Sequence, residues 1–295
     1  MRRFGAATPL PVRAPFRLDL TADALRRLAS NAVDVVDADG IYYRALREGD
    51  ETELVAVSQT RAGLEVRATG RRTGRWIPIV ARMLGVEADL TDWYERSSRV
   101  HWLAPIVTAL RGLKPPRYAT LWEACAHAIL FQQISIHAAA SIMRRVVELL
   151  GDPVEAGGVR AIAFPPPERW LEANDESLRG VGISRNKVAH LRSAAAEFAS
   201  GAIDERALER LATPEIAERL CAIRGIGAWS AAVMLLRGMG RLDVFPLRDS
   251  GVARTLAMLA GGVVDEAKLL DVLGPVRGML YYHLLLGRLR NLAPR

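Results

Sequence analysis

The sequence predicts an α+β fold, in which a small mixed β-sheet and helix domain precedes a mostly α-helical, two-lobed body. Three short runs near the N-terminus have the composition of strands and are joined by turn residues that include glycine. From about residue 77 onward, apolar residues recur at spacings of three and four, which is typical of helices. The length of 295 residues also favours two domains. We therefore expect domains at 1–76 and 77–295.

The N-terminal domain is expected to combine one or two helices with several strands. Residues 16–20 alternate like a strand, and Thr21 is a suitable cap for a helix that follows as far as about residue 30. Alternation within 54–59 does not show which face of that strand is buried. Three further strands are expected at 41–47, 53–59 and 63–69.

The rest of the chain is expected to be helical up to the C-terminus. Helical patterns begin at 81–84 and 90–95 and continue through the sequence. Loops rich in Gly and Pro interrupt them, for example at 112–116 and 164–167. We expect a body of many short helices and no further sheet.

The charge, cysteine and histidine content limits which partners, compartments and metal sites we expect for this protein. Lys and Arg number 40 and Asp and Glu 33, so the net charge is +7, which suits a polyanionic partner but is common among soluble proteins. Cys125 and Cys221 lie in apolar helical patterns, which predicts buried free thiols in a reducing compartment. The five histidines show no paired ligand spacing, which argues against a zinc deaminase. The N-terminus has no long apolar run, so we expect neither a signal peptide nor a membrane span, and a cytoplasmic location.

A glycine turn between two helical patterns is the first candidate site. Residues 213–215, Thr-Pro-Glu, can start a helix, and an apolar stripe follows at helical spacing. Gly225 is expected to end this helix and Gly227 to open the next, which runs from about 229 to 236. Free N–H groups at the start of the second helix would form a site for a phosphate. The alternative is an ordinary connection between two helices that contains two glycines.

A single carboxylate, Asp249, is the second candidate. Residues 242–246 are expected to be extended, and Pro246 excludes a continuous helix. Asp249 then precedes a helical pattern with Val252 and Leu256 on one face, so it lies where an N-cap belongs. In a partly dry cleft, such an anion can stabilise a cationic sugar as a glycosidic bond breaks, or orient a water. The alternative is an N-cap aspartate with no chemistry.

These two features together resemble a known family. The run I-x-G-I-G-x-W-S-A at 223–231, followed by D-V-F-P-x-x-D at 243–249, resembles the helix-hairpin-helix DNA glycosylases, specifically the bacterial 3-methyladenine DNA glycosylase II type. The resemblance implies a helix-hairpin-helix motif at 213–237 and a catalytic segment at 243–256. It implies that the hairpin glycines bind a DNA phosphate, that carbonyls of Ile223 and Gly225 hold Na⁺ or K⁺, and that Asp249 is the catalytic carboxylate.

The same resemblance excludes two chemistries. Bifunctional members carry a lysine nucleophile two residues after the second hairpin glycine, and this chain has Trp229 there. The iron–sulfur branch carries four cysteines after the catalytic region, and no cysteine follows Cys221. We therefore expect base release by water, no strand cleavage, no iron–sulfur cluster and no required cofactor.

Two upstream stretches extend the resemblance. Residues 128–135 are similar to the family's I-x-G-Q-Q-[IV]-S turn, except that Phe131 replaces the glycine. The resemblance makes Gln133 the candidate wedge that fills the gap left by a flipped nucleotide; the alternative is that Gln132 and Gln133 cap a buried helix. Residues 178–187 match G-[IL]-S-R-x-K, and we expect a turn between helices with Ser184 as N-cap.

The resemblance also implies the residues that contact substrate. The expected DNA-binding set comprises Gly225, Ile226, Gly227, Ala228, Trp229, Ser230, Gln133 and Arg254. Alkylated bases are electron-poor and stack on aromatic faces, so the expected base pocket comprises Trp229, Gln132, Tyr281 and Tyr282. Core packing is the alternative for the two tyrosines. Val233 and Val276 stand where some members have Tyr and Trp, so the N-terminal domain could supply an aromatic such as Phe16.

The resulting hypothesis is a monofunctional DNA N-glycosylase that releases alkylated purines from damaged double-stranded DNA, with 3-methyladenine as the first expected substrate and 7-methylguanine as the second. The protein is expected to be a monomer, cytoplasmic and nucleoid-associated in a bacterium. The alternatives are a related glycosylase for deaminated or other damaged bases, and a damaged-DNA-binding module without catalysis.

Overall fold

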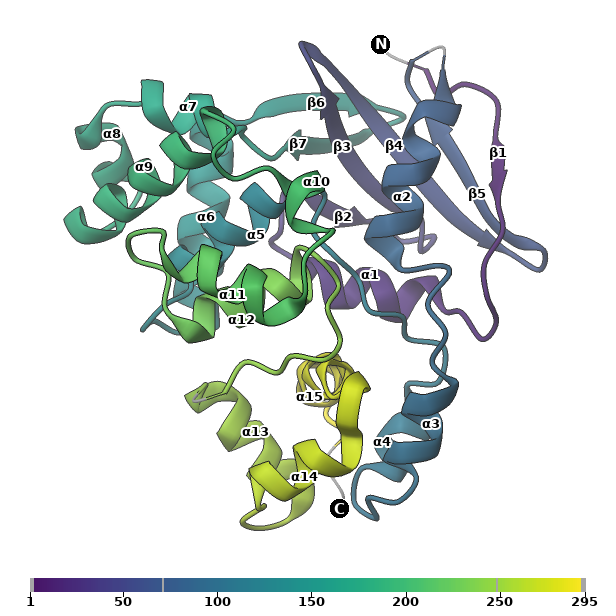
Figure 1. Ribbon diagram of the computed structural model, residues 1–295. Helices are drawn as coiled ribbons and strands as arrows, with labels where there is room; N and C mark the ends of the chain where they lie inside the picture. Colours follow the sequence, from purple (N-terminus) through teal and green to yellow (C-terminus); the bar gives the residue numbers. More distant parts are fainter. Residues whose placement is uncertain (1–2, 71, 248, 293–295) are drawn as a thin grey trace.

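The computed structural model describes residues 3–70, 72–247 and 249–292, and it has the α+β architecture that the sequence predicts (Figure 1). A five-stranded antiparallel sheet has the order β1-β5-β4-β3-β2, and a separate two-stranded hairpin contains β6 and β7. The strands are β1 Thr8–Leu10, β2 Asp34–Val36, β3 Tyr42–Glu48, β4 Glu51–Thr60, β5 Gly63–Ala68, β6 Asp152–Ala156 and β7 Val159–Ala163.

Short helices make up most of the remaining chain. Those of the first half are α1 Leu18–Arg26, α2 Ile77–Leu84, α3 Thr91–Ser97, α4 Ala104–Ala109, α5 Leu121–Leu130 and α6 Ile136–Leu150. Those of the second half are α7 Pro167–Glu172, α8 Asp175–Gly180, α9 Arg185–Ala199, α10 Glu205–Leu208, α11 Thr213–Cys221, α12 Ala228–Arg237, α13 Ser250–Ala260, α14 Glu266–Leu273 and α15 Gly278–Leu289. Two 3₁₀ turns, η1 Thr73–Trp76 and η2 Gly274–Val276, complete the assignment.

The helices form two groups (Figure 1), and each group surrounds its own apolar core. Helices α5, α6, α9, α11 and α12 surround one core, whereas α3, α4 and α13 to α15 surround the other. The chain crosses between the groups in the non-helical segment after α12. Helix α2 contributes Val80, Met83 and Leu84 to the core of the sheet, and the domain boundary at 76/77 stays a prediction.

The three long strands agree with the sequence prediction, and the structure explains why their facing was ambiguous. In β3, Tyr42 and Leu46 point into the core shared with α1 and α2, whereas Tyr43 and Ala45 pack against β6 and β7. Both faces of the sheet centre are therefore apolar. A strand buried on two faces shows no polar alternation, so the pattern alone does not identify an inner face.

Two predictions about secondary structure are wrong. Residues 16–20 do not form a strand: α1 begins at Leu18, with Arg17 and not Thr21 at the N-cap position. The Leu18 N–H donates to Oε1 of Gln59, 2.7 Å away on β4, so the cap comes from a distant residue. The body is also not helical throughout, because 152–163 form the β6–β7 hairpin around Gly157 and Gly158 at positive φ.

The cysteine prediction is half right. Cys125 on α5 is fully buried, and burial raises the pKa of its thiol to about 12. Cys221 is free but exposed, because it follows the buried Leu220 and falls on the outer face of α11. Burial of the second thiol is therefore a wrong prediction.

A buried ion cluster joins the sheet to the helical body. Arg44 on β3 donates to Asp34 Oδ1 at 2.6 Å and to Glu123 Oε2 at 2.5 Å, and all three side chains are nearly inaccessible. Removing one member would leave an uncompensated charge in the interior. The cluster therefore fixes α5, and the turn that follows it, relative to the sheet.

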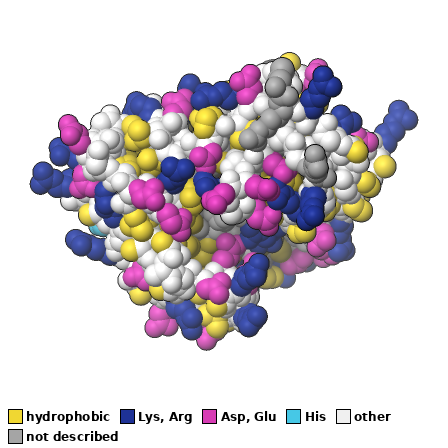
Figure 2. All heavy atoms as spheres, turned by 90° about the horizontal axis from the view of Figure 1, so that it is seen from above, with side chains coloured by type: hydrophobic (Ala, Val, Ile, Leu, Met, Phe, Trp, Pro, Cys, Tyr) yellow, Lys and Arg dark blue, Asp and Glu magenta, His cyan; other side chains and the backbone are white. Residues whose placement is uncertain are grey.

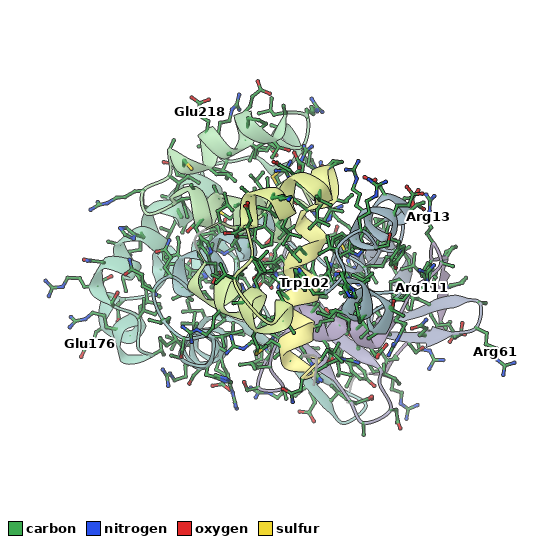
Figure 3. The ribbon with its side chains drawn as sticks, turned by 90° about the horizontal axis from the view of Figure 1, so that it is seen from below. Arg13, Arg61, Trp102, Arg111, Glu176 and Glu218 are labelled. Carbon is green, nitrogen blue, oxygen red and sulfur yellow. The ribbon has the colours of Figure 1, made fainter. Side chains whose placement is uncertain are left out.

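Charge is mixed over the surface. In the face seen from above, basic and acidic side chains are interspersed and no single basic field dominates (Figure 2). Viewed from below, Arg61 projects outward from the turn between β4 and β5, while Trp102 lies near the centre (Figure 3). Among the helices that the structure describes, none combines the length and apolar character needed to cross a bilayer.

A buried histidine makes stability depend on pH. His283 on α15 is fully buried, its ring centroid 4.7 Å from that of Trp93, and burial lowers its pKa from 6.5 to about 4. Between pH 6.5 and pH 4, His283 is protonated in the unfolded chain but stays neutral in the folded chain. The free energy of unfolding therefore falls as the pH falls toward 4. Between pH 7 and pH 5, the free energy of unfolding of the parent should fall by about 2 kcal/mol more than that of His283→Phe.

Urea unfolding at the two pH values measures this difference. The matched control is His137→Gln, because His137 is exposed and the variant should keep the pH dependence of the parent. Equal losses in the parent and in His283→Phe would contradict the prediction.

Candidate active site and nucleic-acid interface

A cleft of about 1290 Å³ lies where the two helical groups meet. Its walls are the turn between α5 and α6, the start of α12, helix α13, helix α15 and the residues directly after α1. Binding pockets for small molecules are commonly about 300–1,000 Å³, so this cleft has room for a nucleotide and part of a backbone.

Asp249 lies in the cleft and caps α13, as the sequence predicts. Its Oδ1 accepts hydrogen bonds from the N–H groups of Gly251 at 2.8 Å and Val252 at 3.0 Å. Its Oδ2 accepts a third from the indole Nε1–H of Trp229, also at 3.0 Å. The carboxylate is half-buried and oriented from two sides, and the indole contact is one that the sequence reasoning missed.

The hairpin has the expected position and a different backbone. Gly225 has φ +90, so a left-handed residue is needed there, but Gly227 is extended with φ −99 and ψ −178. Gly227 opens α12 as expected, but it does so without the positive φ for which glycine is suited. A Cβ at Gly227 would meet no atom within 4 Å, whereas one at Gly225 would lie 2.4 Å from the ring of His190. Gly225 is required by the fold, and Gly227 leaves open space beside the helix start.

Helix boundaries around the hairpin refine the prediction. Helix α11 begins at Thr213, so Thr213 is inside the helix and is not the cap. The Glu215 carboxylate accepts the Ala212 N–H at 3.0 Å instead. Helix α12 starts at Ala228, and the first N–H groups of a helix have no partner within it. Ile226 has a buried side chain, so only its backbone is available at the tip.

Gln132 is bonded to the hairpin. Its Nε2 donates to the Gly225 carbonyl at 3.0 Å and to the Ser230 hydroxyl at 2.8 Å. Gln132 lines the cleft, as expected for the base pocket, but its amide is already engaged. Lys187 Nζ donates to the carbonyls of Leu130 and Gln132 at 2.8 and 2.7 Å. The turn after α5 is thus tied to both α9 and the hairpin.

Gln133 projects from this tethered turn. It is exposed, lines the cleft and has φ +58, which is uncommon for a residue with a side chain. Among the described residues, its side chain has no hydrogen-bond partner. Strained backbone positions often occur at functional sites. The geometry is consistent with a wedge, and that role stays a prediction.

The back wall of the cleft differs from the expected base pocket. Tyr281 and Val233 line it, but Tyr282 does not: it is fully buried and donates to the carbonyl of Pro116 at 2.9 Å. Phe16 is also outside the cleft, because it packs in the core of the sheet. The wall is completed by residues that sequence reasoning missed, namely Arg27, His127 and Phe131.

Two further expectations concern the outer parts of the site. Arg254 is exposed on α13 and lines the cleft, and its contact with DNA stays a prediction. Ser184 caps α9, as predicted, and its hydroxyl accepts the Lys187 N–H at 3.4 Å. Lys187 is part of the S-R-x-K motif at 184–187, so the sequence motif could have identified it as a site residue. Arg27 directly follows α1 and belongs to no motif that would have identified it as a site residue.

Comparisons with known proteins agree with this geometry. A model of the family described as "HhH-GPD superfamily base excision DNA repair protein" matches residues 126–268. A DNA-3-methyladenine glycosylase of Bacillus subtilis is 29% identical over 174 residues, which cover 59% of this chain and 57% of that protein. DNA-3-methyladenine glycosylase 2 of Escherichia coli is 29% identical over 231 residues, 74% of this chain and 77% of that protein.

A solved structure extends the similarity to the whole fold. The 3-methyladenine DNA-glycosylase from Archaeoglobus fulgidus superposes with a TM-score of 0.79 at 24% identity, covering 96% of this chain and 98% of that one. The family match includes the hairpin, Trp229 and Asp249, which the geometry brings together at one cleft. This chain belongs to the HhH-GPD superfamily of base excision DNA repair proteins.

Proposed function

We propose that this protein is a monofunctional DNA N-glycosylase that flips alkylated purines out of double-stranded DNA and releases them by hydrolysis. The first substrates to test are 3-methyladenine and 7-methylguanine. One observation carries the proposal: Asp249 lies in the cleft with three N–H donors on its carboxylate, beside a hairpin whose helix start is free. The names of the Bacillus and Escherichia relatives support the same activity.

Different residues bind the DNA phosphate, stabilise the flipped-out nucleotide and break the glycosidic bond. N–H groups from Ala228 onward hold a DNA phosphate, and Gly227 lets the phosphate approach the backbone. Gln133 enters the stack where the damaged nucleotide has left, which offsets part of the few kcal/mol that unstacking costs. Arg254 adds a second contact to the backbone.

The bond-breaking step requires an anion more than an acid. The C1′–N bond breaks and its electron pair leaves with the purine, which leaves an oxocarbenium-like sugar. Asp249 stabilises that positive charge because its carboxylate is held in place before the reaction. Water then adds to C1′ and gives up a proton. A cationic purine is a good leaving group, so no strong general acid is required.

Trp229 excludes the lyase route. A lysine at this position could form a Schiff base with C1′, whereas an indole cannot. The indole N–H instead donates to Asp249 Oδ2, so this residue orients the carboxylate. The reaction therefore ends at an abasic site with an intact strand.

A monovalent cation at the hairpin and a monomeric state belong to the proposal as well. The Ile223 carbonyl accepts the Ile226 N–H at 3.0 Å, and the Gly225 carbonyl accepts from Gln132. Each carbonyl oxygen has a second lone pair that a Na⁺ or K⁺ ion could share with a phosphate. The donor set therefore fits a hard monovalent ion.

Mass spectrometry of the bases released from alkylated genomic DNA tests the proposal. We expect free 3-methyladenine or 7-methylguanine, an unbroken strand and no covalent adduct after borohydride treatment. Release of only deaminated bases would favour a related glycosylase, and binding without release would favour a sensing module. A borohydride-trapped adduct would contradict the role given to Trp229.

A further inference from the structure

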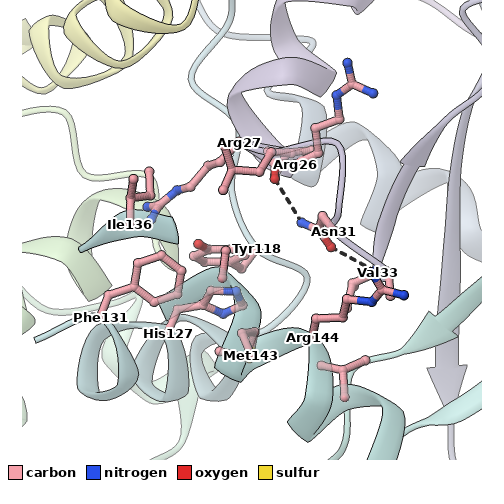
Figure 4. Close-up of a pocket in the computed structure, with 15 residues that line it drawn as sticks. Arg26, Arg27, Asn31, Val33, Tyr118, His127, Phe131, Ile136, Met143 and Arg144 are labelled. Carbon is pink, nitrogen blue, oxygen red and sulfur yellow. Dashed lines mark hydrogen bonds between the residues drawn. The ribbon is translucent and has the colours of Figure 1, made fainter. Parts of the chain in front are cut away.

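The back wall of the cleft carries an arginine on an aromatic ring. The Arg27 guanidinium lies 5.1 Å from the ring centroid of Phe131, the residue that departs from the glycine of the related motif. Figure 4 shows Arg27 reaching over Phe131, with Tyr118 and His127 nearby. Arg27 and Phe131 line both the main cleft and a smaller cavity of about 30 Å³.

Arg27 is held in this position by its surroundings. It follows the last residue of α1 with φ 57 and ψ −54, which is an unfavourable backbone conformation for a residue with a side chain. Its Nη2 donates to the Tyr281 hydroxyl at 2.9 Å. Its Nε is buried without a hydrogen-bond partner. Within the described ranges, no carboxylate pairs with Arg27, so its positive charge is not neutralised.

A second buried cation adds to this charge. Arg237 lies 4.6 Å from the ring centroid of Tyr118 and donates to the Ala24 carbonyl at 3.0 Å, again with no carboxylate partner among the described residues. These cations also affect the pKa of His127. Its pKa is well below the ordinary value, mainly because of burial and further because of Arg27, Arg237 and Arg44. The wall that a flipped base would approach is therefore positive.

From this arrangement we infer that Arg27 sets the charge selectivity of the pocket: compared with the same pocket without this charge, it shifts selectivity away from cationic alkylated bases and toward neutral ones that carry an acceptor atom. The inference rests on the proposed glycosylase function and narrows its substrate class. A neutral adduct can accept a hydrogen bond from the guanidinium. A cationic purine would meet a like charge in a partly dry cleft.

The aromatic contribution does not offset this repulsion. A cationic base is attracted to the face of an aromatic ring, but Arg27 already covers the Phe131 face. Displacing Arg27 would break its hydrogen bond to Tyr281 and leave the tyrosine hydroxyl without that donor. A cationic purine remains the better leaving group, so the effect of Arg27 must be measured as a change between variants.

The experiment compares single-turnover release of two alkylated purines by the same protein preparation. Duplexes carry either 1,N⁶-ethenoadenine, which is neutral, or 7-methylguanine, which is cationic. The variant Arg27→Gln should raise the ratio of 7-methylguanine rate to ethenoadenine rate by about tenfold or more. A ratio cancels the fraction of folded enzyme, so partial misfolding does not affect the result.

Two matched variants separate charge at this position from other effects. Arg27→Lys keeps the positive charge and should keep the ratio within about threefold of the parent. Arg26→Gln removes one charge from the neighbouring residue, which pairs with Asp23 and does not line the main cleft, and should also leave the ratio unchanged. An unchanged ratio in Arg27→Gln, with both bases still released by the parent, would overturn the inference alone. Failure of the parent to release either base would instead contradict the proposed function.

Discussion

Replacing Asp249 by asparagine should reduce single-turnover release of alkylated purines by about a thousandfold or more, with the fold kept intact. The carboxylate charge opposes the positive charge that develops on the sugar, and an amide of the same shape lacks it. Removing one preorganised electrostatic group from an active site commonly reduces the rate by about a hundred- to a thousandfold, and here a full charge is lost.

The helix should tolerate this change. Asparagine is as good an N-cap as aspartate, and its Oδ1 can still accept from Gly251 and Val252. The amide Nδ2 would face the Trp229 indole N–H, so two donors would meet where a hydrogen bond exists now. This mismatch should lower the free energy of unfolding by about 1–2 kcal/mol.

Asp265→Asn is the matched control for this experiment. Asp265 caps α14, accepting the Lys268 N–H at 3.1 Å, and does not line the cleft. The control therefore makes the same chemical change at another helix start and should release bases at the parent rate. If Asp249→Asn released bases as fast as the parent while remaining folded, Asp249 would not be the catalytic group.

Local chemistry explains what the sequence predicts well. The cap at Asp249 and the turn at Gly225 depend on neighbouring backbone groups, so a short segment contains all the information. The apolar stripe with Ile216 and Leu220 is likewise read from spacing, and both residues are fully buried. The local sequence is therefore enough to predict the positions of the hairpin and of its carboxylate.

Contacts between distant residues explain what the sequence does not predict. Gln59 caps α1 from another strand, and Arg27 meets Tyr281 across most of the chain. Lys187 on α9 donates to carbonyls of the turn after α5, although the sequence identifies it only as part of a motif. Propensities and motifs within a short segment do not specify these pairs. The Gln59 contact determines where α1 begins, and the position of Arg27 determines the charge of the pocket. The base pocket was the weakest prediction because three of its residues come together only in the tertiary fold.

The two hairpin glycines should respond differently to alanine. Gly225→Ala forces a side chain into φ +90 and puts a Cβ 2.4 Å from the His190 ring, so the free energy of unfolding should fall by about 2–4 kcal/mol. Gly227→Ala meets no atom within 4 Å on an extended backbone, so its stability should change by about 0.5 kcal/mol or less. Gly49→Ala is the control for backbone cost alone, because Gly49 has φ +58 and open space.

For DNA binding, in contrast to stability, the substitution at Gly227 should have a large effect. A methyl group at Gly227 occupies the space through which a phosphate would approach the first N–H groups of α12, so affinity for undamaged duplex should fall about tenfold at low salt. Because one phosphate contact is lost, the slope of log affinity against log salt should become shallower by about one. Equilibrium titration at several salt concentrations measures both quantities. A stable Gly227→Ala protein with parental affinity and slope would mean that the phosphate binds elsewhere, and the open space beside Gly227 would then be a feature of the turn alone.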